Sequence, residues 1–181
     1  CTGAAQTPEV PLVAASHLDL VSVGLNCALG AKEMRPYIKE LSEKSPFYVS
    51  THPNAGLPNQ FGEYDETPET MSEYLRDFLD HRFVNIIGGC CGTTPDHIRA
   101  FARLAEKAER HIPAERDHGL KLSGLEPLAV FEGSNFINIG ERLNVAGSKK
   151  FARLIREKKY DEALEIARHQ VENGAQVLDV N

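Results

Sequence analysis

The residues of this chain with the strongest chemical character are three cysteines that follow predicted β-strands. Cys27 ends the segment 24–27, and Cys90 and Cys91 stand inside the Gly-Gly-Cys-Cys-Gly segment 88–92. Thiolates are common ligands of zinc in proteins, and sulfurs that share one ion lie within about 4 Å of one another. The sequence therefore predicts a zinc site formed by Cys27, Cys90 and Cys91.

Two other roles compete with metal binding. A lone buried cysteine usually serves as a small apolar side chain. A redox disulfide is disfavoured because adjacent cysteines make a strained bridge and the chain has no Cys-x-x-Cys. The glycines beside Cys90 and Cys91 favour the metal site, since two adjacent side chains reach one ion only from an irregular backbone. Cys1 lacks such a context, and we expect no role for it.

The elements that must position these thiols form three successive units of a strand, a polar loop and an amphipathic helix. Strands are predicted at 18–23, 47–50 and 83–87. In each of the three helices, the residues spaced at i, i+3, i+4 and i+7 should face the core. These residues are Met34, Tyr37, Ile38 and Leu41 in the first helix, Met71, Tyr74, Leu75 and Phe78 in the second, and Ile98, Phe101, Ala102 and Ala105 in the third. Thr67 and Thr94, each followed by proline, are the expected N-caps. This alternation predicts parallel strands whose carboxyl ends, and hence the thiols, meet on one face.

A second domain is expected after a polar linker. We predict a first domain at 1–112, the linker at 113–124 and a second domain at 125–181. The second domain should contain a short strand at 125–131, a strand at 136–139, two helices and a strand at 176–180, with Gly174 as the helix C-cap.

The predicted fold class is α/β, with parts of two (β/α)8 TIM barrels, both truncated in this chain. Three strand–helix units do not close a barrel, which needs eight, and buried parallel strands need neighbours on both sides. A small open doubly wound sheet is the alternative, but the sequence lacks its glycine fingerprint.

Other polar residues stand at predicted strand ends. Asn26 and Asn54 are expected to line a pocket, although Asn commonly forms turns. We expect His52 to position its loop rather than to bind zinc, and His97 to cap a helix or face solvent. At the start of the second domain, Glu141 and the nearby Asn144 could bind a heterocycle with both donors and acceptors, or be solvated loop residues.

Composition excludes several classes of function. The net charge is -6 without a basic cluster, so nucleic acid is not an expected partner. Every apolar run is far shorter than the roughly 20 residues that span a bilayer, so no membrane segment is expected. Four cysteines without regular spacing favour a reducing cytoplasm over a secreted disulfide framework.

Three strings of the first domain, GLNCALG, THPNAGLPN and GGCCGTTPDHI, resemble the homocysteine S-methyltransferase domain. The string FGEYD is similar to the cobalamin-dependent methionine synthases in particular. The resemblance implies that Cys27, Cys90 and Cys91 bind a catalytic zinc ion and that homocysteine takes the open fourth position. It also implies that Asn54 occupies this position in the absence of substrate, and it is consistent with Asn26 in the substrate pocket.

Two segments of the second domain, 136–148 and 176–181, resemble the first two strands of pterin-binding barrels. The resemblance implies that four residues face the pterin: Glu141, Asn144, Asp179 and Asn181. Leu143 and Ala146 depart from the pattern, because many relatives have threonine there, which removes a hydroxyl without changing the class.

Together the resemblances imply methyl transfer from 5-methyltetrahydrofolate through enzyme-bound cobalamin to zinc-activated homocysteine, which yields methionine. The cobalamin-binding and reactivation modules would lie outside this chain, and the isolated chain is expected to be inactive. One alternative is a cobalamin-independent zinc homocysteine S-methyltransferase. Another is a non-catalytic module stabilised by zinc, which a closed site with four protein ligands would favour.

Overall fold

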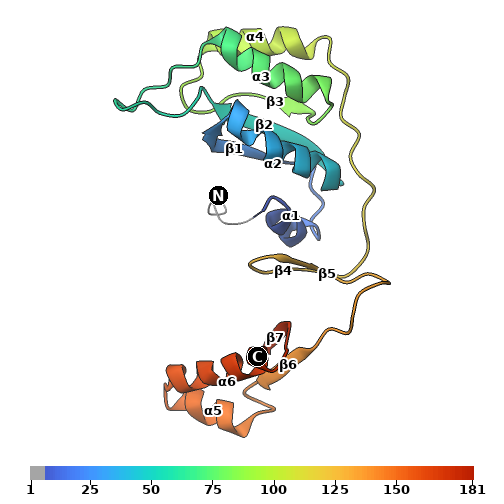
Figure 1. The fold of residues 1–181 in the computed structure, drawn as a ribbon, viewed down its shortest axis with the longest axis vertical. Helices are drawn as coiled ribbons and strands as arrows, with labels where there is room; N and C mark the ends of the chain where they lie inside the picture. The colour runs from blue at the N-terminus through green and yellow to red at the C-terminus, as the bar shows by residue number, and fades with distance from the viewer. Residues whose placement is uncertain (1–6) are drawn as a thin grey trace. The chain divides into compact units, whose positions relative to one another are not determined.

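The computed structural model describes residues 7–181, and Cys1 lies outside them. The chain divides into two compact units, Cys1–Phe131 and Glu132–Asn181 (Figure 1). Each unit has its own cluster of buried apolar side chains. No helix in the described range is both long and apolar enough to cross a membrane.

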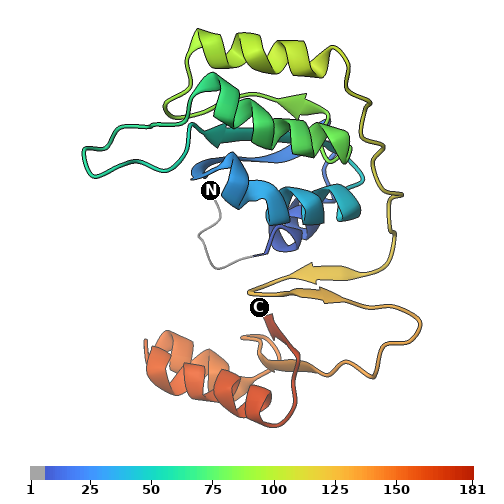
Figure 2. The same cartoon turned by 45° about the horizontal axis from the view of Figure 1, so that its top comes forward.

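The first unit is built on a parallel three-stranded sheet in the order β1-β2-β3. Its strands are β1 Ser22–Gly30, β2 Tyr48–Asn54 and β3 Ile86–Ile87. The helices are α2 Ala31–Lys44 between β1 and β2, α3 Pro68–Asp80 between β2 and β3, and α4 Pro95–Ala105 after β3. Helices α3 and α4 lie side by side in both views (Figures 1 and 2). The predicted α/β class with parallel strands is therefore confirmed.

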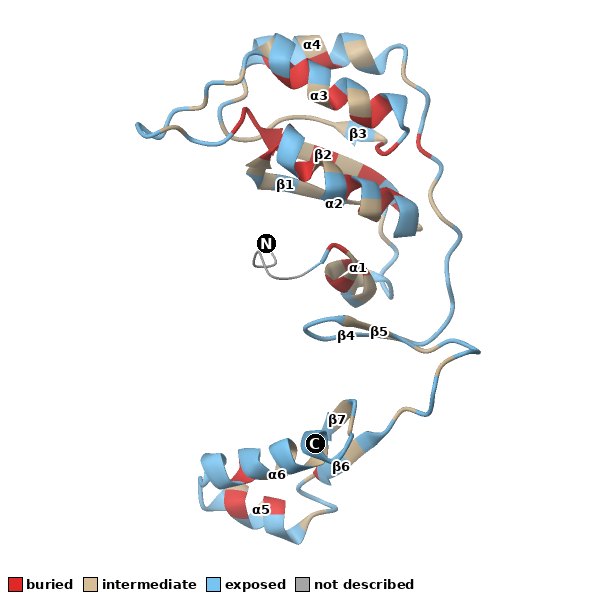
Figure 3. Cartoon of the chain, in the orientation of Figure 1, coloured by how far each residue is buried: buried red, intermediate tan, exposed pale blue. Residues whose placement is uncertain are grey.

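The core of this unit forms where the helices pack on the sheet. Met34 and Ile38 of α2, Leu75 of α3 and Val49 of β2 are each at most 2% exposed, and Figure 3 shows the buried residues concentrated in this layer. The N-cap prediction for α3 is confirmed, because the Thr67 side chain accepts a hydrogen bond from the backbone N–H of Thr70.

The inward face of α4 differs from the predicted one. Phe101 is buried as expected, but Ile98 is 47% exposed and the inward position beside it belongs to His97, which is 5% exposed. The predicted Ala102 and Ala105 are also exposed. The prediction from apolar spacing is wrong here because His97 takes the place of an apolar residue in the core. Both of its ring nitrogens have hydrogen-bond partners, which makes its burial possible.

The first two strands lie further along the chain than predicted. The segment 18–21 is apolar except for Asp19, but Val21 is 77% exposed, and pairing begins only where Ser22 meets Tyr48. Strand β2 runs on to Asn54 because Thr51 and Asn54 stay buried beyond the predicted end at residue 50. Strand β3 is short because the Asn85 side chain, in place of backbone, accepts the N–H of Val49.

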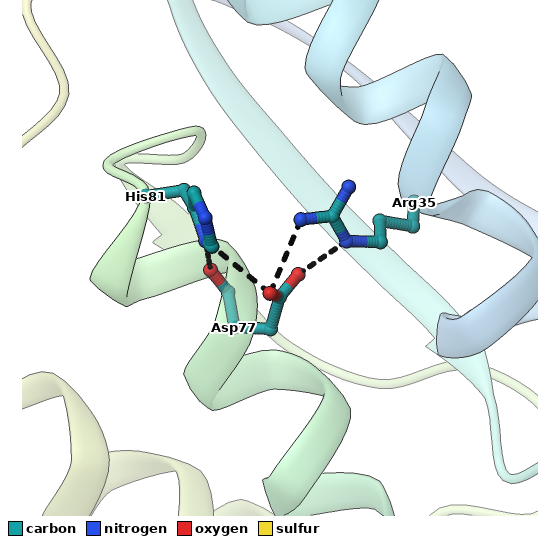
Figure 4. Close-up of polar contacts among 3 residues, drawn as sticks. All are labelled: Arg35, Asp77 and His81. Atoms are coloured by element: carbon teal, nitrogen blue, oxygen red, sulfur yellow. Dashed lines mark hydrogen bonds and ion pairs between the residues drawn. The ribbon is translucent and has the colours of Figure 1, made fainter.

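A charged contact joins α2 to α3 on their outer side (Figure 4). The Arg35 guanidinium donates two hydrogen bonds to the Asp77 carboxylate, at 2.6 and 3.2 Å. His81 Nδ1 lies 3.2 Å from the same carboxylate. The guanidinium carbon also lies 5.5 Å from the centroid of the Phe83 ring. These contacts fix the orientation of the two helices relative to each other.

Helix α1 Glu9–Ala15 and an antiparallel hairpin complete the first unit. The hairpin strands are β4 Lys121–Ser123 and β5 Pro127–Ala129, and the Ser123 hydroxyl donates to the carbonyl of Val10 in α1 at 2.9 Å. The hairpin thus packs with the first unit. The domain limits 1–112, 113–124 and 125–181 stay a prediction.

The second unit pairs β6 Ile139–Leu143 with β7 Val177–Val180 in parallel. Helices α5 Lys149–Arg156 and α6 Tyr160–Glu172 stand between them in the chain and pack on Leu143. The first strand begins three residues later than expected, and Phe136 is 85% exposed. Gly174 follows α6 with a φ of +95°, as its predicted role requires.

The two faces of α4 lead to a prediction. Phe101→Ala should lower the free energy of unfolding by about 3–5 kcal/mol, because it removes a buried ring and leaves a cavity. Ile98→Ala should cost less than about 1 kcal/mol, since this side chain is half exposed. Urea unfolding followed by circular dichroism compares the two variants, and equal losses would contradict the observed orientation of α4.

Candidate metal centre

Cys27 lies where β1 loses its regular pairing with β2. The register is continuous up to Asn26, opposite His52, and resumes at Gly30, opposite Asn54. Within this break Cys27 and Ala28 have φ values of 60° and 61°, a left-handed conformation that non-glycine residues seldom adopt. The break turns the Cys27 side chain away from the course of the strand and toward the loop after β3.

Cys90 and Cys91 are held by the end of β2. The N–H of Cys90 donates to the carbonyl of Pro53 at 2.8 Å, and the N–H of Cys91 donates to Asn54 Oδ1 at 3.1 Å. The carbonyl of Cys91 accepts from the N–H of Ala55 at 2.9 Å. Both thiols are thus fixed by hydrogen bonds of the backbone that bears them.

The three sulfurs have the spacing that zinc requires. Cys91 Sγ lies 3.7 Å from Cys27 Sγ and 3.9 Å from Cys90 Sγ, and all three sulfurs lie within 4.8 Å of one another. Tetrahedral ligands at about 2.3 Å from zinc are about 3.8 Å apart. The donor set and its spacing therefore fit a zinc ion.

The thiols differ in their ease of ionisation. The pKa of Cys27 is lowered, most by the N–H of Ala28 and next by the thiols of Cys91 and Cys90. The hydrogen bond with Cys27 raises the pKa of Cys91, which the Tyr64 hydroxyl partly opposes. Three thiols so close cannot all ionise without a cation, because each thiolate disfavours the next. Ion binding and full deprotonation of the site are therefore linked.

Asn54 connects the two sides of the site. Asn54 is 3% exposed, its Oδ1 accepts the N–H of Cys91, and its side chain also helps to lower the pKa of Cys27. The Asn54 oxygen that would bind an ion therefore already accepts a hydrogen bond from the N–H of Cys91. Its assignment as a fourth ligand stays a prediction.

A pocket of 340 Å³ opens beside Cys90. Its lining consists of Gly24, Leu25, Asn26, Ser50, His52, Gly89 and Cys90. Asn26, which was expected to line a pocket, is part of this lining. His52 lines the pocket without joining the thiol cluster, and a Cβ on Gly88 would lie 2.4 Å from its ring, so a larger residue at position 88 would displace that ring.

His97 caps α4, one of the two roles expected for it. Its Nδ1 accepts the N–H of Thr94 at 3.2 Å, and its Nε2 donates to the carbonyl of Glu66 at 2.9 Å. The second bond joins the helix after the cysteine pair to the loop before α3. The position of the cysteine pair thus depends on both segments.

In the second unit the predicted residues stand at the ends of β6 and β7. Glu141 is exposed and pairs with Arg142 at 3.1 Å. Asn144 Oδ1 accepts the N–H groups of Ala146 and Gly147, which forms a turn. Asp179 and Asn181 are exposed. The structure leaves the pterin contacts of these four residues untested.

Sequence reasoning missed Tyr64 and Ser50. Tyr64 lies against Gly92, directly after the cysteine pair, and Cys91 raises the pKa of the Tyr64 hydroxyl. Its segment, FGEYD, indicated only a family resemblance and no role for the tyrosine. Ser50 lines the pocket two positions before His52, and the alternation of side chains along β2 was the signal for it.

Comparison with known families gives two matches. The model described as homocysteine S-methyltransferase matches residues 3–105. The model described as pterin binding enzyme matches residues 140–181. The first match contains all three clustered thiols, and the second contains all four residues predicted to face a pterin.

The unequal thiols give a prediction for the metal-free chain. Because the thiolate is the reactive form, Cys27 should become alkylated by iodoacetamide at lower pH than Cys91 as the pH rises from 6 to 10. Peptide mass spectrometry at each pH measures both rates, and the urea-unfolded chain is the control in which they converge. A lower apparent pKa for Cys91 would contradict the arrangement.

Proposed function

The chain belongs to the homocysteine S-methyltransferase family, and from this we propose that it provides the zinc centre of an enzyme that methylates homocysteine. The observation that supports this best is the convergence of three thiols within 4.8 Å, beside a polar pocket. When bound, zinc would hold the substrate thiol in its deprotonated, nucleophilic form at neutral pH.

The residues of this chain would perform three tasks. Cys27, Cys90 and Cys91 would hold the ion and leave its fourth position for the substrate sulfur. Asn26 would line the pocket that receives the rest of homocysteine, and Asn54 would keep the Cys91 backbone in place or, without substrate, bind the ion. Each task uses a group that already lies at the pocket or within the cluster.

We further propose that the methyl donor is 5-methyltetrahydrofolate. The pterin binding match supports this, since a zinc-only homocysteine methyltransferase has no need of such a domain. Glu141, Asn144, Asp179 and Asn181 would contact the pterin. Cobalamin would carry the methyl group, as in the cobalamin-dependent methionine synthases that FGEYD resembles, and would bind, together with the reactivation module, outside this chain.

Each unit would be part of a (β/α)8 barrel. The first unit has three parallel strands among its described residues, and closure needs eight. The isolated chain should therefore bind zinc without turnover. Free thiols at the centre accord with a reducing compartment, and we propose the cytoplasm.

The metal's role can be tested in the protein that contains this chain. Cys27→Ala should abolish methylation of homocysteine, because two thiolates reproduce neither the charge nor the geometry of the centre. Methyl transfer from methyltetrahydrofolate to cobalamin should persist, since it would use the second unit. Assays of both half-reactions measure this, with Cys1→Ala as the matched control.

A purely structural zinc gives a different result for the same variant. The free energy of unfolding would fall with the loss of the metal, while homocysteine methylation would continue at a near-normal rate. That outcome would support the non-catalytic alternative and refute the proposal.

The pterin assignment has its own test. Asp179→Asn should weaken binding of methyltetrahydrofolate about tenfold, the size expected when one hydrogen bond to a charged group is lost. Zinc content should not change. Asp161→Asn, at the start of α6, is the control, and isothermal titration measures the affinities. Equal affinities for the two variants would remove Asp179 from the pterin site.

A further inference from the structure

Strand β6 contains one residue more than the stretch of β7 that pairs with it. Its pairing with β7 is regular up to Gly140 and resumes at Leu143. Between these positions, Glu141 and Arg142 stand opposite Asp179 alone. An extra residue of this kind is a β-bulge, and it changes the side of the sheet to which the later residues point. The bulge therefore brings together Glu141 and Asp179, two residues that we propose to contact the pterin.

The bulge allows β6 to face the helices at both of its ends. A Cβ on Gly140 would lie 2.7 Å from Gln170 Oε1 of α6, so this position points toward the helices. Leu143 also faces them, since it is 5% exposed and packs with Phe151 and Leu154 of α5. In a regular strand, residues three positions apart point to opposite sides of the sheet. The packing of this unit therefore requires the extra residue.

A bulge disrupts the hydrogen bonds between two strands, and here a side chain supplies a partner. The N–H of Arg142 donates to Gln170 Oε1 at 2.9 Å. Helix α6, which bears Gln170, packs beside β6 (Figure 1). The nitrogen of the same amide, Nε2, is buried and has no hydrogen-bond partner among residues 7–181. The polar contact that Gln170 makes through its side chain is therefore the one to the bulge.

We propose that Gln170 is a positioning residue for methyltetrahydrofolate, because its hydrogen bond with Arg142 holds the bulge that sets Glu141 opposite Asp179. Without this bond the bulge loses a restraint, and in regular pairing Glu141 would point to the same side as Leu143, toward the helices. The inference rests on the proposed function, since it presupposes that Glu141 and Asp179 contact the pterin. Gln170 acts through Glu141 and needs no contact of its own with the ligand.

The test measures the binding of methyltetrahydrofolate to the protein that contains this chain. Gln170→Leu keeps the approximate size of the side chain and removes the oxygen that accepts the N–H of Arg142. Gln170→Glu is the conservative variant, because it keeps an oxygen there and changes only the atom without a partner. Gln176→Leu is the matched control, since Gln176 Oε1 accepts the N–H of Asn138 at 3.1 Å, ahead of the bulge.

Gln170→Leu should weaken binding about threefold to tenfold in isothermal titration, within the size of one lost hydrogen bond. Gln170→Glu and Gln176→Leu should both bind as the wild type does. Gln170→Asn withdraws the oxygen by one methylene and should also weaken binding, which keeps the test available if Gln170→Leu does not fold. In the Glu141→Gln background, Gln170→Leu should cause little further loss, because a residue that acts through another is not additive with it.

Results of three kinds would overturn this inference alone. Wild-type affinity in Gln170→Leu, or equal losses in Gln170→Leu and Gln170→Glu, would show that the oxygen does not affect the ligand. Equal losses in Gln170→Leu and Gln176→Leu would show a general effect of lost hydrogen bonds on the unit. Additive losses with Glu141→Gln would show that Gln170 does not act through Glu141. A wild-type protein that binds no methyltetrahydrofolate would overturn the proposed methyl donor as well.

Discussion

The close approach of three thiols is the constraint on which the first unit depends. Outer strands of a flat three-stranded sheet are about 10 Å apart, yet Cys27 Sγ lies 3.7 Å from Cys91 Sγ. The distance closes because β1 breaks its register after Asn26 while the N–H of Cys90 stays bound to Pro53 at the end of β2. The left-handed backbone at Cys27 costs about 1–2 kcal/mol, which the buried core beneath the sheet readily offsets.

Sequence reasoning succeeded where the signal was local. Thr67 followed by proline predicts a helix start from neighbouring residues alone, and the structure has it. It failed where a distant partner decides the outcome. His97 enters the core because the Glu66 carbonyl, 31 positions away, accepts its Nε2–H, and residues 18–21 stay outside the sheet because β2 begins pairing only at Tyr48. Spacing predicted that the cysteines lie on one face, but no pattern predicted that Tyr64 would lie against Gly92.

The two units place their polar groups in different ways. In the first, side chains from separate elements converge on one point, so the site exists only in the folded state. In the second, Glu141 and Asn144 make their contacts with neighbours in sequence. The arrangement of Asn144 is set by the turn after β6, and that of Glu141 by its neighbour Arg142 within the strand.

The contact between Arg35 and Asp77 on the outer side of the helices has a consequence for ionic strength. Both side chains are a third or more exposed, at 41% and 34%, so dissolved salt screens their attraction. The thiol cluster is positioned instead by backbone hydrogen bonds and by side chains packed out of water, which salt screens far less. A rise in salt concentration should therefore loosen the outer helix contact while the spacing of the sulfurs stays constant.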